Sequence, residues 1–261
     1  MYKRCCEPSV SDITSAAMAS FFNGKVVIVT GSSVGIGRVI ARDFALLGAK
    51  VTITGRGGEN LQETKKIIVK AGGKEADVLV VVADVTEANE RKKIVDETVK
   101  RFGQIHVLIN NAGARLPEET AFEAMDMETF DRTINLNTKA AIHLSQLAAP
   151  YLSKTKGAIV NISSVGSFPF TNNLSVFYAI AKAALDQATV QLAGALGKQG
   201  IRVNGVNPGA TRSEFVYRMG ANEEQAQQAV QFLADRSKSS FIIGHRLVVD
   251  GGAVLSNTFM S

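Results

Sequence analysis

The feature that most constrains the fold is a regular alternation of short apolar runs with longer amphipathic stretches. The apolar runs are rich in β-branched residues, as in Val26-Val27-Ile28-Val29, which is typical of strands buried on both faces. The predicted strands span residues 25–30, 50–54, 78–82, 106–110, 158–163, 201–206 and 246–249. The predicted helices span residues 36–47, 59–71, 87–102, 127–152, 177–196 and 222–235.

Strict alternation of strand and helix implies right-handed crossovers and a mainly parallel sheet with helices on both faces. No internal repeat, low-complexity linker or charge block divides the 261 residues. We therefore expect one doubly wound, Rossmann-type α/β domain over residues 21–261, with a seven-stranded sheet. Residues 1–20 lack the apolar core of a signal peptide and are expected to form a disordered tail, with Met1 or Met18 as the start.

A glycine-rich turn, Thr30-Gly31-Ser32-Ser33-Val34-Gly35-Ile36-Gly37, joins the first predicted strand to the first helix. Gly31 permits a sharp turn, Gly35 lets the backbone approach a pyrophosphate, and Gly37 allows close helix packing. The helix directs free N–H groups and its positive dipole end at the phosphates. The turn, with Ser33 and Ile36 included, is predicted to bind a dinucleotide, since a second strand follows about 20 residues on.

The end of the second strand predicts which dinucleotide binds. An Asp or Glu there would hydrogen-bond the ribose 2′-hydroxyl of NAD, but this chain has Gly55 followed by Arg56. A missing carboxylate removes repulsion against a 2′-phosphate, and Arg56 can pair with that phosphate. The pattern favours NADP(H), with NAD(H) as the alternative.

A second polar cluster suits proton transfer to a carbonyl oxygen. Tyr178 and Lys182 are four apart on a predicted helix, so both side chains emerge on one face. A nearby ammonium is expected to favour the phenolate and lower the pKa of Tyr178 from about 10. Ser164, at the end of the fifth predicted strand, can donate a hydrogen bond to the carbonyl oxygen.

These motifs together resemble the short-chain dehydrogenase/reductase family from Asn23 to about Gly252. The resemblance implies that Lys182 also holds the nicotinamide ribose, and that Asn137 completes a tetrad with Ser164, Tyr178 and Lys182. Asn135 is the rival for that place, but the spacing from Phe130-Asp131 favours Asn137. Further cofactor contacts implied by the resemblance are Asp84, Val85, Asn110, Ala112, Gly113, Pro208, Gly209 and Ser213.

Two stretches, residues 52–56 and 183–187, resemble a subgroup near tropinone reductases and related carbonyl reductases of animals. The chain departs from the family pattern after Pro208-Gly209. Ser213 stands where a Thr is usual, and the segment that normally closes over substrate is shortened to about residues 214–221. A lid excludes water and completes a pocket, so its shortening puts substrate affinity in question.

The composition limits the compartment and the kinds of partner that we expect for this chain. Cys5 and Cys6 are adjacent and are the only cysteines, which excludes a disulfide framework and indicates a reducing, cytoplasmic compartment. The three histidines are far apart, so no metal site is expected. Lys and Arg are scattered despite a net charge of +5, and no apolar stretch spans a bilayer; we expect neither nucleic acid nor membrane as partner.

The sequence thus predicts an NADP(H)-dependent carbonyl reductase or alcohol dehydrogenase that acts on a small ketone or secondary alcohol. One alternative is a protein that binds the cofactor without turnover, because the substrate segment is short. The other is the same chemistry with NAD(H). By resemblance, helices 127–152 and 177–196 are also expected to pair between subunits of a homodimer or homotetramer.

Overall fold

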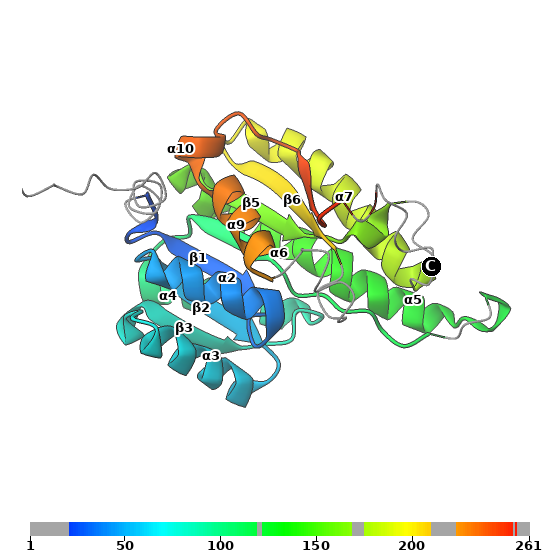
Figure 1. The fold of residues 1–261 in the computed structure, drawn as a ribbon, viewed down its shortest axis with the longest axis horizontal. Coiled ribbons are helices and arrows are strands. Elements are labelled where there is room, and N and C mark those ends of the chain that lie inside the picture. Colours follow the sequence, from blue (N-terminus) through cyan, green and yellow to red (C-terminus); the bar gives the residue numbers. More distant parts are fainter. Residues whose placement is uncertain (1–20, 119–121, 169–174, 210–222, 253, 255–261) are drawn as a thin grey trace, which may run out of the picture.

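The computed structural model describes residues 21–118, 122–168, 175–209, 223–252 and 254. Seven strands form one sheet in the order β3-β2-β1-β4-β5-β6-β7, and all six strand pairs are parallel (Figure 1). The strands are β1 Val26–Thr30, β2 Lys50–Gly55, β3 Val78–Val82, β4 Val107–Asn110, β5 Ala158–Ile162, β6 Arg202–Pro208 and β7 Arg246–Val249. The predicted fold class is confirmed, and every predicted strand is present.

The helices also follow the prediction, with one interruption and one addition. They are α2 Gly35–Leu46, α3 Gly58–Lys70, α4 Ala88–Phe102, α5 Met127–Ile134, α6 Ala140–Thr155, α7 Val176–Gly197, α9 Glu223–Ala234 and α10 Arg236–Ser239. Single 3₁₀ turns occupy Glu75–Asp77, Phe122–Ala124 and Val165–Ser167. The expected helix 127–152 is broken by a wide π-helical turn, Asn135–Lys139, and the four-residue α10 was not predicted because it is too short to show a period.

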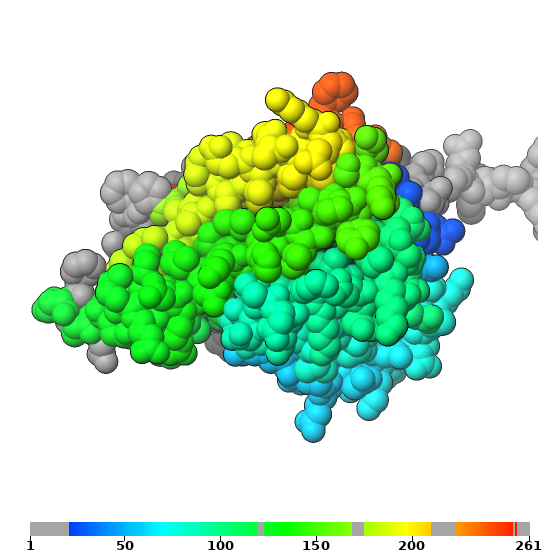
Figure 2. All heavy atoms as spheres, turned by 180° about the vertical axis from the view of Figure 1, so that it is seen from behind, coloured from blue at the N-terminus to red at the C-terminus, as the bar shows by residue number. Residues whose placement is uncertain are grey.

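Two hydrophobic cores lie on opposite faces of the sheet, and β1 contributes to both. Val27 and Val29 pack with residues of α2, α3 and α9, whereas Ile28 packs with residues of α4, α6 and α7. This alternation follows from the two-residue period of a strand. Figure 2 shows the second face, where α4, α6 and α7 lie side by side across the sheet. Burial on both faces explains why β1 reads as an uninterrupted apolar run.

The carboxyl ends of the parallel strands meet at one edge of the sheet. β1 and β4 are neighbours in the sheet, although β2 and β3 separate them in the sequence. The chain therefore crosses from one half of the sheet to the other between β3 and β4. The loops that leave adjacent strands on either side of such a switch point diverge and leave a crevice, which is where open α/β sheets bind ligands. The loops after β1, β4, β5 and β6 carry several of the predicted site residues, among them Ser33, Gly113, Ser164 and Gly209. Ser213, residues 214–221 and residues 1–20 lie outside the described residues.

Candidate active site

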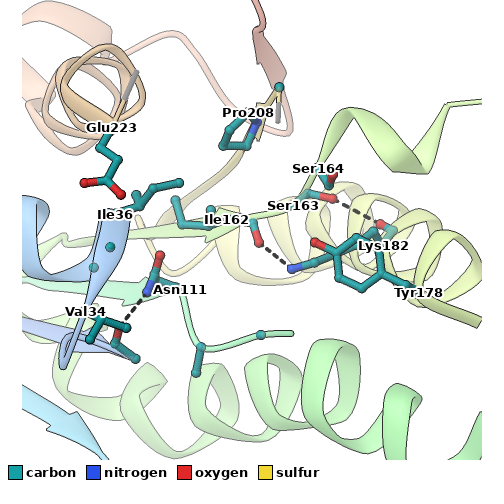
Figure 3. A pocket seen from close by; sticks show the side chains of 16 residues that line it. Val34, Ile36, Asn111, Ile162, Ser163, Ser164, Tyr178, Lys182, Pro208 and Glu223 are labelled. Carbon is teal, nitrogen blue, oxygen red and sulfur yellow. Dashed lines mark hydrogen bonds between the residues drawn. The ribbon is translucent and has the colours of Figure 1, made fainter. Parts of the chain in front are cut away.

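A cavity of about 330 Å³ opens at this edge of the sheet (Figure 3). It is lined by parts of the glycine turn, the loops after β4, β5 and β6, α7, and the first residue of α9. The lining residues are Gly31, Val34, Gly35, Ile36, Gly37, Asn111, Ala112, Gly113, Ile162, Ser163, Ser164, Tyr178, Lys182, Pro208, Gly209 and Glu223. The structure therefore brings the two predicted clusters together around one cavity.

The glycine turn has the geometry that its sequence predicts. Gly31 and Gly35 have φ angles of +63° and +57°, a region that favours glycine. A Cβ on Gly37 would lie 2.3 Å from the Gly31 carbonyl oxygen, so α2 packs directly on the turn. The N-cap residue of α2, Val34, makes no side-chain cap hydrogen bond, so its side chain does not compete with an anion for the first N–H groups of the helix. The turn thus fits a dinucleotide pyrophosphate.

The turn is held by groups from β1 and from the loop after β4. Asn111 donates through Nδ2 to the carbonyl oxygens of Thr30 and Gly31 at 2.8 and 3.0 Å. The Thr30 hydroxyl accepts from the backbone N–H groups of Asn111 and Ala112, both at 2.9 Å. Sequence reasoning missed both side chains. The side chain of its candidate Asn110 instead donates to Asn161 and Ser145, and Asn110 does not line the cavity.

The predicted 2′-phosphate corner lies beyond the cavity, at the carboxyl ends of β2 and β3. The Ser33 hydroxyl oxygen is 3.3 Å from the position that a Cβ on Gly55 would take, and Arg56 is exposed. Arg38, which sequence reasoning missed, donates to the Ser33 carbonyl and, at 3.0 Å, to the Thr64 hydroxyl. Arg38 therefore places a guanidinium beside Ser33.

Hydrogen bonds hold the loop that carries Asp84 and Val85, two of the predicted cofactor contacts. Asp84 accepts hydrogen bonds from the backbone and hydroxyl of Thr86, both at 2.8 Å. The Val85 carbonyl accepts from the buried guanidinium of Arg91 at 2.5 Å, and Arg91 also donates to Nδ1 of His143 at 2.8 Å. Burial lowers the pKa of Arg91, because the charged form is poorly solvated. Arg91, which sequence reasoning also missed, supports this loop without lining the cavity.

Two members of the predicted tetrad, Asn137 and Lys182, meet at the loop after β4. Lys182 is 3% exposed and donates through Nζ to the Ile162 carbonyl at 2.9 Å. A Cβ on Gly113 would lie 2.7 Å from Oδ1 of Asn137 and 3.1 Å from the Lys182 Nζ, so a larger residue there would displace these two side chains. Asn137 lies in the π turn, where its Nδ2 donates to the carbonyls of Thr133 and Ala114 and its Oδ1 accepts from the Ala114 N–H, each at 3.0 Å. The rival Asn135 donates to the Thr86 carbonyl, and neither asparagine lines the cavity itself.

The pKa values differ in one respect from the sequence expectation. Burial raises the pKa of Tyr178, and an interaction with the Ser164 side chain opposes the increase. The Lys182 Nζ lies 5.6 Å from the ring centroid of Tyr178 and donates to the Ile162 carbonyl, so burial rather than this ammonium sets the direction in which the Tyr178 pKa shifts. Burial lowers the pKa of Lys182 itself to about 8, and the charge of Asp186 opposes this shift.

The described residues contain neither a metal-binding cluster nor a membrane-spanning helix. No three His, Cys, Asp or Glu side chains gather there in an arrangement that could hold a metal ion. The helices within the described ranges include none that is both long enough and apolar enough to cross a bilayer.

The comparisons with known proteins agree with this geometry. The sequence profile of the short chain dehydrogenase family matches residues 25–225, and the chain belongs to this family of oxidoreductases. A Caenorhabditis elegans short-chain dehydrogenase/reductase of unknown function, solved with cofactor, is 41% identical over 90% of this chain and 96% of its own, with a TM-score of 0.85. The apo glucose dehydrogenase of the same organism is 44% identical over 90% of this chain and 99% of its own, with a TM-score of 0.81. Tropinone reductase-like 3 of Erythroxylum coca is 36% identical, covering 88% of this chain and 93% of its own length.

Proposed function

We propose that this protein is an NADP(H)-dependent oxidoreductase that interconverts a small ketone and the corresponding secondary alcohol. The observation that carries the proposal is the single cavity in which Ser164, Tyr178 and Lys182 lie beside the glycine turn (Figure 3). When bound, the nicotinamide supplies or accepts the hydride at the carbonyl carbon. The chain itself must hold the carbonyl oxygen and move one proton.

In ketone reduction, the Tyr178 hydroxyl gives its proton to the carbonyl oxygen of the substrate. Its raised pKa keeps this hydroxyl protonated at neutral pH, which suits a general acid. The Ser164 hydroxyl donates a hydrogen bond to the same oxygen as negative charge develops there. The nearby Lys182 ammonium stabilises the phenolate left behind, and Asn137, beside Lys182 and Gly113, is positioned to support a proton relay.

The proposed preference for NADP(H) rests on the corner formed by Ser33, Gly55 and Arg56. This corner has no carboxylate at the end of β2 to bind a ribose 2′-hydroxyl, and Arg56 and Arg38 supply positive charge. The alternative of NAD(H) keeps the same chemistry and would leave these two arginines without a phosphate to bind.

The direct test of the coenzyme is a titration of the purified protein with NADPH and NADH. We expect Arg56→Ala to weaken NADPH binding by roughly 1.5–3 kcal/mol, the value of a hydrogen bond to a charged group. NADH binding should hardly change, because NADH lacks the 2′-phosphate. Equal affinities for the two coenzymes in the unmodified protein, or equal losses in the variant, would contradict the assignment.

The substrate class is tested by an activity panel with both coenzymes. Steroids, cyclic diketones, quinones, glucose and tropinone form a suitable panel, the last two because of the names of the similar proteins. Reduction of a ketone or oxidation of an alcohol supports the proposal. Tight NADPH binding without turnover of any substrate would favour the alternative, a cofactor-binding protein that does not catalyse the reaction.

The assembly and the compartment also remain proposals. Ile142 on α6 and Ile180 and Val190 on α7 are between 37% and 45% exposed, on the two helices expected to pair between subunits. We propose a homodimer or homotetramer built on these helices in the cytoplasm. Sedimentation of the purified protein measures its mass directly, and a monomer at micromolar concentration would contradict the assembly.

A further inference from the structure

Helix α7 carries a third buried polar side chain behind Tyr178 and Lys182. Asp186 is four residues beyond Lys182, so all three leave the same face of the helix. The Asp186 side chain is 2% exposed, and the ion pairs found among the described residues do not include it. A carboxylate buried in this way must be satisfied by hydrogen bonds.

Those hydrogen bonds come from two residues on other elements. Nδ2 of Asn207, near the end of β6, donates to Oδ1 and Oδ2 of Asp186 at 3.1 and 2.9 Å. The Ser167 hydroxyl donates to Oδ2 at 2.6 Å. Asp186 therefore connects the middle of α7 to the end of β6 and to the 3₁₀ turn that follows β5.

The same two donors reach the backbone of Ser164. Nδ2 of Asn207 lies 3.1 Å from the Ser164 carbonyl oxygen, and the Ser167 hydroxyl lies 2.8 Å from it. The amide has two N–H groups, so it can serve the carboxylate and the carbonyl together, whereas the Ser167 hydroxyl has a single hydrogen for the two acceptors. Oδ1 of Asn207 is buried without a partner among the described residues. The carboxylate thus determines which way the amide points, because a flipped amide would turn Oδ1 toward Asp186.

We propose that Asp186 is a positioning residue for Ser164: through Asn207 and Ser167 it fixes the 164–167 turn and so aims the Ser164 hydroxyl into the cavity. This inference rests on the proposed function, in which that hydroxyl holds the carbonyl oxygen of the substrate. The Ser164 hydroxyl oxygen also accepts from the Gly166 N–H at 3.0 Å, so its orientation follows the backbone of the turn. The charge of Asp186 also favours the protonated form of Lys182, against the effect of burial on its pKa.

The test compares Asp186→Asn and Ser167→Ala with the unmodified enzyme, on a ketone that the latter reduces with NADPH. Because a displacement of about 1 Å in a positioned group can cost 100-fold, we expect kcat to fall on the order of 10–100-fold in Asp186→Asn. Ser167→Ala, which keeps the Asn207 tether, should lose about 3–10-fold. The dissociation constant of NADPH, read from its fluorescence, should stay within about two-fold, because these residues do not touch the proposed cofactor site.

Two buried polar residues of the same elements serve as controls. Thr189 on α7 accepts from Asn161 at 2.9 Å, and Asn204 on β6 donates to the Ile242 carbonyl at 2.8 Å. Thr189→Val and Asn204→Ala should lower Tm without changing kcat by more than about two-fold, since neither contacts the Ser164 turn.

An exchange variant separates positioning from stability. Asp186→Asn combined with Asn207→Asp restores an amide–carboxylate pair, but the side chain of residue 207 then has no N–H to donate to the Ser164 carbonyl. We expect Tm to recover while kcat stays low. Three results would overturn the positioning role. The first is recovery of kcat together with Tm in the exchange variant, and the second is a normal kcat in both Asp186→Asn and Ser167→Ala. The third is a loss of kcat in the controls equal to the loss in Asp186→Asn. If Asp186→Asn does not fold, a normal kcat in Ser167→Ala overturns the positioning role. An unmodified enzyme that reduces nothing with NADPH would instead overturn the proposed function.

Discussion

At the residue scale, Glu223 places a carboxylate among the groups proposed to hold the pyrophosphate. Its Oε1 lies 3.6 Å from the position that a Cβ on Gly35 would take, at the N-terminus of α2, and it points toward the turn in Figure 3. The helix N-terminus favours this negative charge in the absence of another anion. A pyrophosphate would therefore meet a like charge at the place that otherwise suits it.

We expect Glu223→Gln to tighten NADPH binding by about 2–10-fold at low salt, with less effect as salt screens the charge. The measurement is a fluorescence titration at two ionic strengths. The neighbouring Glu224 is exposed and does not line the cavity, so Glu224→Gln is the matched control. Unchanged or weaker binding in Glu223→Gln, relative to this control, would show that Glu223 does not oppose the cofactor.

The spacing of Tyr178 and Lys182 predicted their common helix face, because an α-helix repeats every 3.6 residues. It could not predict where the Lys182 ammonium points, since that depends on the Ile162 carbonyl of a strand 20 residues away. Nor could it single out Asp186, whose partners Ser167 and Asn207 come from separate elements. Local spacing thus predicts which side chains share a face, and tertiary packing decides their partners.

At the element scale, the turn between β1 and α2 depends on glycine at a point of close packing. A Cβ on Gly37 would lie 2.3 Å from the Gly31 carbonyl oxygen and 2.4 Å from Nδ2 of Asn111. The first of these is a backbone atom, so the turn itself would have to move.

We therefore expect Gly37→Ala to lower the free energy of unfolding by about 1–3 kcal/mol, the usual cost of overpacking, and to weaken NADPH binding at least tenfold. Urea unfolding and the fluorescence titration measure the two effects. Gly194 on α7 is exposed, and its Cβ would meet nothing within 4 Å, so Gly194→Ala should stabilise the protein by roughly 0.5–1 kcal/mol. A Gly37→Ala variant with normal stability and binding would show that the turn tolerates a larger residue.

The elements also show where sequence periodicity is insufficient. The apolar pattern predicted one helix over residues 127–152, but a π turn at Asn135–Lys139 interrupts it. Such a turn keeps the chain helical, so the pattern of apolar residues barely changes. The family resemblance favoured Asn137 over Asn135, and the structure places Asn137 beside Gly113 and Lys182. Helical periodicity by itself could not make that choice.

At the scale of the whole molecule, the edge of the sheet opposite the cavity contains a histidine that links strands. Nδ1 of His106 accepts a hydrogen bond from the Val26 N–H at 3.0 Å, and the His106 carbonyl accepts from the Ala158 N–H at 3.0 Å. Burial, and then the charge of Lys25, lower the pKa of His106 from 6.5 to about 4. The native state therefore keeps this imidazole neutral in a pH range where the unfolded chain protonates it.

Stability should consequently fall as the pH decreases from 6.5 to 4, because only the unfolded state binds the additional proton. The imidazole is about half-buried, so solvent screening reduces the expected loss to roughly 1–2 kcal/mol. Urea unfolding between pH 7 and 4.5 measures the slope. His106→Gln keeps a hydrogen-bond acceptor without a titrating ring, so its slope should be shallower. Parallel slopes for the two proteins would contradict the role of His106.

The alternation of strands and helices was enough to predict the parallel sheet and all seven strands, because each period is a local property of the chain. The order in which the strands lie was not predicted, since it depends on crossovers that bring β1 beside β4, nearly 80 residues further along. The proposed function depends on this order, because it places the glycine turn of the first half and Tyr178 and Lys182 of the second half around one cavity.

The central claim, that Tyr178 transfers the proton in an NADP(H)-dependent reduction, is tested most directly by Tyr178→Phe. The variant keeps the half-buried ring and loses only the hydroxyl, so NADPH affinity and Tm should stay close to those of the unmodified enzyme. The measurement is kcat/KM for a ketone that the unmodified enzyme reduces with NADPH. We predict a loss on the order of 10²–10⁴-fold, the usual contribution of a positioned general acid. Near-normal turnover in the folded, NADPH-bound variant would contradict the account.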